Sequence, residues 1–417
     1  MAWFKTKFTP SKELEPREFL LRAGKILGIL LVITLGLVWP YSCLWLYLSG
    51  DVGVERAVDA QASGQFAIFG SGVSQDFVDY KLKLYGQVKP TVVTLGSSRV
   101  MQFRGEFFTQ KFLNMGGVAG NIPVLRSTLD AMLKMHKPEA IILGLDFWWF
   151  GTKWNPDPFM EEPPTSGSYN YGLESVKKPW EWLFSGKMSL KDLARPILTP
   201  LGLGFNDNRY GIMAQQTSDG FGSDGSWYYT AEITGQKRPF DFQFQDTLTQ
   251  VEYGIKAFYH ASADQKLISE AHLDALAEIY CRLMSKGIRT YVFIPPLAPT
   301  VFLRMRDMES NYPHLFNLPQ ALRARGIQVL DCSDPRKLGS SDCEFVDGFH
   351  GGEVTYLRIL RHLADQWSSL LAYVDLSAVN KAIREWNGHA LRYNPMLTPY
   401  WEVDFMELNC PKRKPKM

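Results

Sequence analysis

The longest apolar stretch of the chain lies close to its N-terminus. Residues 26–48 read ILGILLVITLGLVWPYSCLWLYL and include no charged side chain. A helix of about 20 apolar residues can cross the hydrocarbon core of a bilayer, so this run predicts a transmembrane helix, which Pro40 should kink. Two alternatives stay open. One is a cleaved signal peptide, although the run is long and starts late, and the other is a buried core helix, although it has no polar face.

The flanks of the predicted span indicate its orientation. Lysines and arginines precede it, and Trp and Tyr cluster at its far end, as they do at a membrane interface. The positive-inside rule then leaves residues 1–25 in the cytoplasm. We expect a single-pass anchor in the inner (cytoplasmic) membrane and an extracytoplasmic domain from residue 51 onward. In a bacterium with two membranes that domain is periplasmic.

Short apolar runs alternate with helical patterns from about residue 89 onward. The runs PTVVTLG, KFLNMGG, EAIILGLDF, IRTYVFIPP and IQVLD predict strands, and unbroken runs of this kind are typical of parallel strands covered on both faces. Helices are expected over residues 123–136, 266–286 and 353–371, with an interrupted helix over 300–325. The alternation predicts an α/β fold, a three-layer α/β/α sandwich with a mainly parallel sheet.

The alternation breaks between about residues 151 and 260, which are rich in Gly, Pro, Asn, Trp and Tyr. Irregular segments of this length inside a compact domain are usually functional or carry structure of their own. We interpret this one as an insertion over the sheet edge, within a domain of residues 51–373. Residues 374–417 show little periodicity and end in KRKPKM, so they predict a C-terminal surface extension.

Composition narrows the possible functions. The 417 residues carry a formal net charge of +2, with 46% hydrophobic and 21% charged residues, as in a folded globular protein. Because there is no basic surplus or stripe, nothing points to nucleic acid. The histidines are scattered and there is no CxxC pair, so we expect neither a metal site nor a cofactor. Cys332 and Cys343 could form a disulfide in an oxidising compartment, and two unpaired thiols are the alternative.

A first candidate for chemistry is the loop LGSSRV, which directly follows the strand PTVVT. Sites in open α/β sheets form beyond the carboxyl ends of the strands. Ser98 would lie on a tight turn at the start of a helix, where backbone amides can also hold an anion. The alternative is an ordinary helix cap, since Ser is a favoured capping residue.

Two further loops could complete such a site. VDGFHGGEV offers Asp347 and His350 from one turn, and a nucleophilic Ser needs a base and an acid that orients the base. FLNMGGVAGNI carries Asn114 and Gly116, and amides in a turn of this kind can stabilise an oxyanion. Taken singly, each has a plain alternative, a structural histidine or a tight strand-to-helix turn.

The order of these loops along the chain resembles the SGNH (GDSL-like) hydrolase superfamily, over about residues 89–371 apart from the insertion. The resemblance implies a nucleophile at Ser98, an oxyanion glycine at Gly116, and a base and its orienting acid at His350 and Asp347. Two departures stand out. Ser97 occupies a position where these hydrolases usually have Asp, and Asp146 occupies that of an oxyanion-binding Asn.

A carboxylate cannot donate a hydrogen bond unless it is protonated. The oxyanion hole would therefore consist of amides alone or use another donor, such as Arg99 or Asn121. If Asp146 faces the hole, Asp146→Asn should raise ester hydrolysis.

The Gly-Ser-Ser-Arg loop, the single N-terminal span and the long insertion look like one subgroup of that superfamily. It includes the D-alanyl transfer protein of the teichoic-acid system and periplasmic proteins of polysaccharide O-acetylation. The resemblance implies an O-acyltransferase that acts on a surface glycan or related polymer through an acyl-serine, beside a multi-span membrane O-acyltransferase. An esterase or deacetylase and a non-catalytic scaffold of an envelope complex are the alternatives.

Aromatic residues in and beside the insertion could stack on sugar rings or could pack as core and lid. They are Trp148, Trp149, Trp154, Trp180, Trp182, Trp227, Tyr228 and Tyr229.

Overall fold

The computed structural model describes residues 16–74, 77–151, 156–161, 169–236, 243–261, 268–392, 397 and 403–411. The chain forms two compact units. The first consists of Met1–Leu48 with Tyr171–Gly204, and the second consists of Ser49–Asn170 with Phe205–Met417.

One long helix dominates the first unit. It runs as α1 (Pro16–Ile33), a π-helical turn η1 (Thr34–Val38) and α2 (Trp39–Ser49). Over Arg17–Ser49 it is long and apolar enough to cross a membrane, with a mean hydropathy of 2.1 in a window of which 6% is buried. The predicted apolar helix of spanning length is thus confirmed. Pro40 has no N–H to donate to the carbonyl of Gly36, and a π turn that ends at Val38 lies two residues before it.

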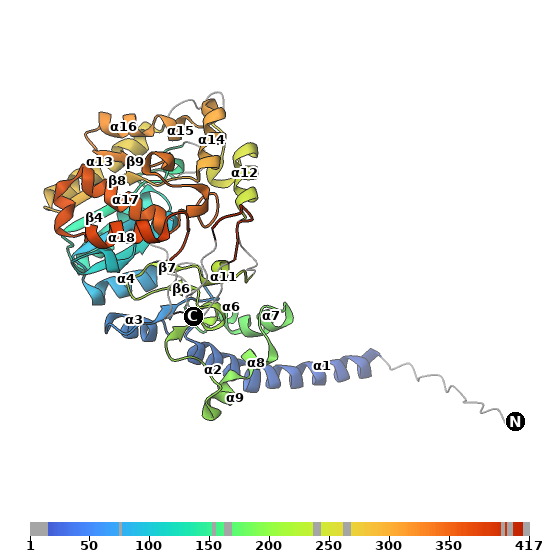
Figure 1. Cartoon of the computed structure of the whole chain (residues 1–417). Coiled ribbons are helices and arrows are strands. Elements are labelled where there is room, and N and C mark those ends of the chain that lie inside the picture. The colour runs from blue at the N-terminus through green and yellow to red at the C-terminus, as the bar shows by residue number, and fades with distance from the viewer. Residues whose placement is uncertain are drawn as a thin grey trace, which may run out of the picture. The chain divides into compact units, whose positions relative to one another are not determined.

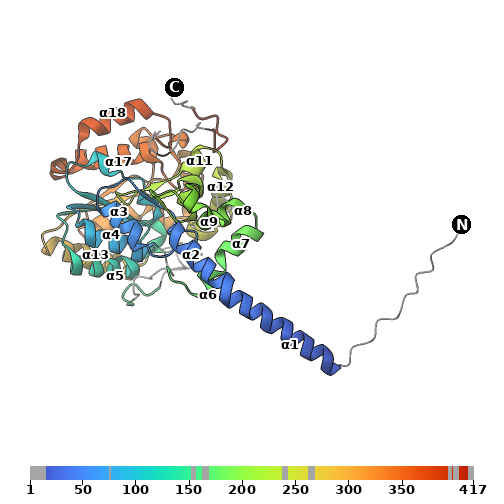
Figure 2. The same ribbon diagram turned by 90° about the horizontal axis from the view of Figure 1, so that it is seen from below.

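The rest of the first unit is a run of short helices (Figures 1 and 2). They are α6 (Leu173–Val176), α7 (Lys178–Phe184), α8 (Leu190–Leu193), α9 (Arg195–Leu198) and the 3₁₀ turn η5 (Thr199–Leu201). The segment of residues 151–260, which we interpreted as one insertion, is therefore divided between the two units. Residues 171–204 belong with the apolar helix, and the described residues from Phe205 onward belong to the second unit.

The second unit is built on a five-stranded parallel sheet in the order β3-β2-β4-β8-β9. Its strands are β2 (Val92–Gly96), β3 (Phe112–Gly116), β4 (Ala140–Gly144), β8 (Arg289–Ile294) and β9 (Val329–Asp331). Each lies within one of the five apolar runs of the sequence. The predicted α/β fold with a mainly parallel sheet is confirmed.

Helices pack against both faces of this sheet. Alternate strand residues such as Leu95, Met115 and Leu143 join one core cluster, and Val92 and Ile142 join another. The first cluster includes side chains of α4 (Val78–Val88), α5 (Ile122–Met135), α13 (Glu270–Ser285), α14 (Pro299–Asp307), α15 (Pro313–Phe316) and α16 (Leu318–Ala324). The second includes side chains of α17 (Glu353–Gln366) and α18 (Leu376–Trp386). Because both faces are covered, the strands read as unbroken apolar runs. Helix α18 gives regular structure to the predicted C-terminal extension.

A small mixed sheet in the order β5-β1-β6-β7 accompanies the main one. Its strands are β1 (Ile68–Phe69), β5 (Arg209–Tyr210), β6 (Gly220–Phe221) and β7 (Trp227–Tyr228), with α3 (Glu55–Ala62), α10 (Ile212–Thr217), α11 (Thr230–Ile233) and α12 (Phe244–Tyr253) in the same unit. The fully buried Lys81 joins this region to the main sheet, because its ammonium donates to the carbonyls of Asn114 and Gly225. Burial holds the pKa of Lys81 well below its usual range, although the nearby Asp224 opposes this.

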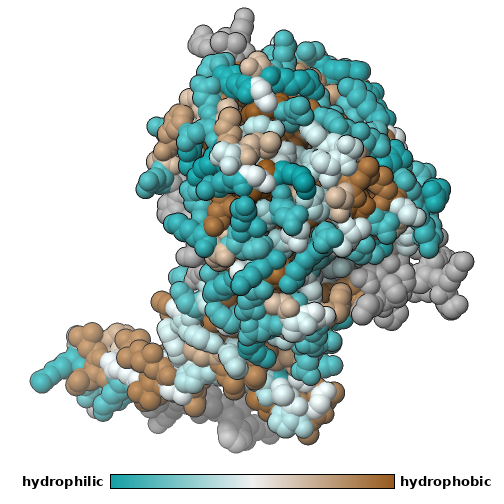
Figure 3. Space-filling view, turned by 90° about the vertical axis from the view of Figure 1, so that its left-hand side faces the viewer, coloured by the Kyte–Doolittle hydropathy of each residue, from teal (hydrophilic) through white to brown (hydrophobic). Residues whose placement is uncertain are grey.

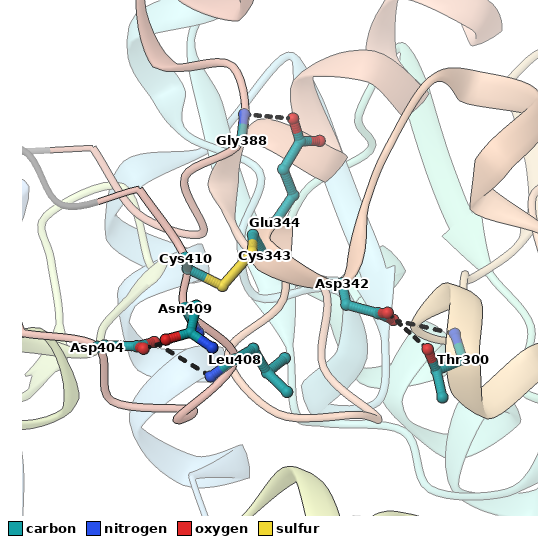
Figure 4. Close-up of a disulfide and its surroundings, with 9 residues drawn as sticks. All are labelled: Thr300, Asp342, Cys343, Glu344, Gly388, Asp404, Leu408, Asn409 and Cys410. Carbon is teal, nitrogen blue, oxygen red and sulfur yellow. Dashed lines mark hydrogen bonds between the residues drawn. A yellow bond between two sulfur atoms is a disulfide. The ribbon is translucent and has the colours of Figure 1, made fainter.

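The disulfide joins Cys343 to Cys410, so the predicted pairing of Cys332 with Cys343 is wrong (Figure 4). Cys332 is fully buried in the apolar cluster that contains α17, where it cannot meet Cys343. Cys410 is brought alongside by the chain end, in which Asp404 accepts hydrogen bonds from the backbone of Leu408 and Asn409. The disulfide therefore ties the chain end to the 3₁₀ turn η9 (Asp342–Glu344), just before Asp347.

Candidate active site

Ser98 lies at the carboxyl edge of the main sheet. Strand β2 ends at Gly96, which has a φ of 155° and at which a Cβ atom would lie 2.9 Å from the carbonyl oxygen of Gly144. A larger residue there would be strained and would push β2 from β4. Ser97 Oγ accepts from the backbone N–H of Arg99 at 3.2 Å and caps the 3₁₀ turn η2 (Ser98–Val100). The capping role therefore belongs to Ser97, and the half-buried Ser98 hydroxyl is left for other contacts.

A tight loop before α17 brings His350 to Ser98. Phe345 and Gly351 form an isolated antiparallel bridge across this loop, which closes it. The distance from Ser98 Oγ to His350 Nε2 is 3.0 Å, and that from His350 Nδ1 to Asp347 Oδ2 is 2.8 Å. The expected hydrogen-bond chain Ser98–His350–Asp347 is therefore present. That these side chains catalyse a reaction stays a prediction.

Asp347 is held as an anion. Its Oδ1 accepts from the backbone N–H groups of Phe349 at 2.7 Å and His350 at 2.5 Å. Burial by itself raises the pKa of this carboxyl, but the charge and N–H of the His350 ring, together with the two backbone donors, outweigh burial and leave the pKa below its ordinary value. An ionised Asp347 accepts a hydrogen bond from Nδ1–H, which leaves Nε2 as the lone-pair nitrogen that faces Ser98.

Arg99 and Asp146 pair with each other, 3.1 Å apart, and both are almost fully buried. Arg99 also donates to the carbonyls of Pro295, at 3.0 Å, and Pro296, so it links the ends of β2, β4 and β8. Its guanidinium lies 4.8 Å from the centre of the Phe349 ring. In this structure the two groups face each other through one contact, while Arg99 Nε and Asp146 Oδ2 have no hydrogen-bond partner among the described residues. That either group lies beside an oxyanion, and that Asp146→Asn speeds hydrolysis, stay predictions.

Asn114 and Gly116 also have partners already. The buried Asn114 amide donates to the carbonyls of Val100 at 2.9 Å and Phe103 at 3.0 Å, and so fixes the loop that follows Ser98. The Gly116 N–H donates to Asn114 Oδ1 at 2.7 Å. That these two groups contribute to an oxyanion hole stays a prediction. They hold the β3 turn against the loop after β2.

The last predicted donor, Asn121, is the N-cap of α5, and its Oδ1 accepts from the Val124 N–H at 2.8 Å. One backbone amide beside the Ser98 side chain stands out. In the described part of the chain, the Ser98 N–H has no hydrogen-bond acceptor. Since it begins a 3₁₀ turn at the edge of the sheet, it is the clearest candidate donor to an oxyanion beside Ser98.

The loops of Ser98 and His350 are also joined by an ion pair that sequence reasoning missed. Arg104 and Glu353 are buried and lie 2.6 Å apart, and Arg104 also donates to Ser226 and Gln102. Arg104 follows the Ser98 turn and Glu353 follows His350, so their pairing fixes the two loops together. With 249 positions between them, no local pattern could have revealed the pair.

The predicted aromatic residues separate into several groups. Trp148 is half-buried and packs 5.3 Å from Phe349, whose ring meets His350 edge-on at 4.9 Å. Trp149 and Trp227 are buried in the core. Trp180 and Trp182 belong to the first unit, Tyr228 covers Arg104, Tyr229 is partly buried against the core, and Trp154 lies outside the described residues. Trp148 and Phe349 are therefore the aromatic pair beside His350.

Within the described ranges, no group of three or more His, Cys, Asp or Glu side chains could hold a metal ion. No protein-family model matches the chain, and no curated protein matches it. The candidate site thus rests on its own geometry.

Proposed function

We propose that this chain is a membrane-anchored serine O-acyltransferase of SGNH type, with a three-layer α/β/α catalytic domain outside the cytoplasm. The observation that carries the proposal is the hydrogen-bond chain from Ser98 Oγ through His350 to the buried Asp347. A hydroxyl, an imidazole and a carboxylate in this order are what activation of a nucleophilic serine requires.

The first half-reaction loads the serine. Ser98 Oγ attacks the carbonyl carbon of an acyl donor while its proton passes to His350 Nε2. The imidazolium that forms is stabilised by the ionised Asp347. The tetrahedral intermediate then collapses, the leaving group departs with the proton from His350, and Ser98 carries the acyl group as an ester.

The second half-reaction transfers the acyl group. An acceptor hydroxyl gives its proton to His350 Nε2 and attacks the acyl-serine, and Ser98 leaves with that proton. In each half the carbonyl oxygen gains negative charge, which the Ser98 N–H can stabilise. Losing one oxyanion donor costs on the order of 100- to 1000-fold in rate. The Gly116 N–H and the Asn114 amide are bonded within the fold, which leaves the Ser98 N–H as the candidate donor, so we expect slow reaction with water.

A positioned acceptor can offset a weak oxyanion hole, because holding two reactants in place lowers the barrier by several kcal/mol. This favours transfer to a bound glycan or related polymer over hydrolysis. The apolar helix of spanning length supports a location at the inner membrane, with the site on the periplasmic side and a multi-span O-acyltransferase as partner. Trp148 and Phe349 offer ring faces to a sugar beside His350.

The test is to incubate the full chain in detergent with a chromogenic acetate ester, with and without a mixture of oligosaccharides. Slow release of the chromophore without acceptor, and acetylated oligosaccharide with it, are the expected results. Ser98→Ala should abolish both, while Ser97→Ala should keep the Ser98–His350 contact. Fast hydrolysis with no acetylated sugar would identify an esterase instead. Activity that survives Ser98→Ala would exclude the serine mechanism.

A further inference from the structure

The short helices of the first unit carry large apolar side chains on their outside. Phe184 is 84% exposed, Leu190 73%, Ile197 68% and Leu201 72%. Single exposed apolar residues are normal on a soluble protein, but a group of them within a short segment marks a surface that meets a partner or a membrane. These four lie within 18 consecutive residues, counted from 184 to 201.

Polar contacts fix this segment to one part of the long helix. Trp180 Nε1 donates to Ser42 Oγ at 2.8 Å, Tyr41 donates to the carbonyl of Leu193, and Trp45 Nε1 donates to the carbonyl of Asp192 at 3.0 Å. All three contacts fall in α2, the end of the span that is rich in Trp and Tyr. Such residues mark the level of the membrane interface. The segment is therefore attached where the apolar helix would leave the hydrocarbon core.

An open groove of about 500 Å³ lies between the long helix and the short ones. It is lined by Leu37, Val38, Tyr41, Trp180, Leu190, Leu193, Ala194 and Ile197. The lining is almost wholly apolar, so water would gain few hydrogen bonds there. A hydrocarbon chain matches the apolar lining of the groove.

We infer that the apolar surface of residues 178–203 inserts into the outer half of the bilayer, and that a lipid acyl chain occupies the groove. The inference rests on the proposed membrane anchor. Its main support is continuity, because the exposed side chains extend the apolar surface of the helix itself, which is dense over the N-terminal helix in Figure 3. An interfacial segment of this kind buries its apolar face about 5–10 Å into the headgroup boundary.

Charge on the same segment agrees with a lipid surface. Within residues 178–203, the basic side chains Lys178, Lys187, Lys191 and Arg195 outnumber the acidic Glu181 and Asp192. Long basic side chains can lay their stems on apolar surface and hold their charges among anionic headgroups. A partner protein domain outside the bilayer is the competing occupant, and it would leave these side chains in water when the chain is alone in a bilayer.

The test uses the full chain in lipid nanodiscs with an environment-sensitive fluorophore on single cysteines. Cys43→Ala and Cys281→Ser remove the two thiols that are not fully buried, and the fluorophore is then placed at Leu27→Cys, Ile197→Cys, Leu201→Cys or Lys191→Cys. Native Cys281, in the Cys43→Ala background, serves as the water-exposed reference. Each sample is compared in ordinary lipid and in lipid with brominated acyl chains, which quench only a fluorophore in contact with them.

We expect quenching at Leu27, Ile197 and Leu201, and little at Lys191 or Cys281. Quenching at Leu27 without quenching at Ile197 and Leu201 would overturn the inference while leaving the anchor intact, and would favour a protein partner for this surface. Absence of quenching at Leu27 would contradict the anchor itself, and the inference with it.

Discussion

Two aspartates at the carboxyl edge of the main sheet are equally buried but are held in different ways. Asp347 is 5% exposed and Asp146 is 1% exposed. Asp347 accepts hydrogen bonds from the imidazole of His350 and from two backbone N–H groups. Asp146 pairs with the guanidinium of Arg99, which is anchored to carbonyls of the β8 end.

Their pKa values accordingly move in opposite directions. For Asp347, the favourable contacts outweigh burial and lower the pKa. For Asp146, burial outweighs the opposing contributions of Arg99, Ser97 and His350, and the pKa is raised. Burial alone thus does not reveal a role. One carboxylate is hydrogen-bonded to the imidazole of His350, and the other to a guanidinium that links strand ends. The predictions below separate these two roles.

The largest expected effect is on turnover. Asp347→Asn keeps the shape of the side chain but favours the wrong tautomer of His350, which should lower kcat by about 10⁴-fold. Asp146→Asn should reduce kcat far less. Initial rates of acetyl transfer for the two variants, with circular dichroism to confirm folding, make the comparison. Equal losses in both would mean that Asp146 also takes part in the reaction.

The second effect is on stability, for which we expect Asp146 to matter more than Asp347. Asp146→Leu leaves the buried Arg99 guanidinium without the side chain to which it donates, and removing one partner of a buried pair costs roughly 3–5 kcal/mol. Denaturant unfolding of the full chain in detergent measures the change in free energy. Replacing both partners, as in Arg99→Leu with Asp146→Leu, should recover part of it, because apolar substitutes for a buried pair are often tolerated. An Asp146→Leu variant as stable as the wild type would show that the pair does not hold the strand ends together.

A disulfide holds the turn just before Asp347, and Asp146 has no such covalent link beside it. Cys343, in the turn just before Asp347, is joined to Cys410 across a separation of 67 residues. Cys343→Ser with Cys410→Ser should lower the free energy of unfolding by about 2–4 kcal/mol. The exposed Cys281→Ser is the matched control and should change little. If the reduced wild type and the double variant unfold like the oxidised protein, the disulfide contributes nothing.

The smallest effect concerns pH. Since the pKa of Asp347 is lowered by folding, the stability it contributes is present above its unfolded pKa, about 3.9, and is lost as pH falls through the folded value. Since the pKa of Asp146 is raised, the stability linked to its proton is present below about pH 3.9 and is lost as pH rises through the folded value. Each pKa unit corresponds to about 1.4 kcal/mol.

The free energy of unfolding, measured between about pH 3 and 7, should depend on pH in opposite directions for the two aspartates. As the pH falls, the free energy of unfolding of Asp347→Asn should approach that of the wild type. The free energy of unfolding of Asp146→Asn should fall further below that of the wild type. Differences from the wild type that change in the same direction would contradict the assignment.

The sheet could be predicted from the sequence because its signals are local. Each of the five parallel strands is a short apolar run, and α5, α13 and α17 carry helical periodicity within one stretch of chain. The Ser98, Asp347 and His350 positions could also be predicted, since each follows a strand or precedes a helix in a recognisable short motif.

Pairings across the fold could not be predicted in the same way. Arg99 with Asp146, Arg104 with Glu353 and Cys343 with Cys410 depend on which strand ends and loops become neighbours. The error over Cys332 has this origin. Short separation favoured Cys343 as its partner, but the side chain of Cys332 points into the core.

The central claim is that Ser98 is an activated nucleophile, and covalent labelling tests it most directly. The full chain is treated with a serine-reactive fluorophosphonate, and the modified residue is located by mass spectrometry. We expect one label on Ser98, retained in Ser97→Ala, greatly slowed in His350→Ala and absent in Ser98→Ala. A label on Ser97, or a folded protein in which Ser98 stays unmodified, would contradict the claim.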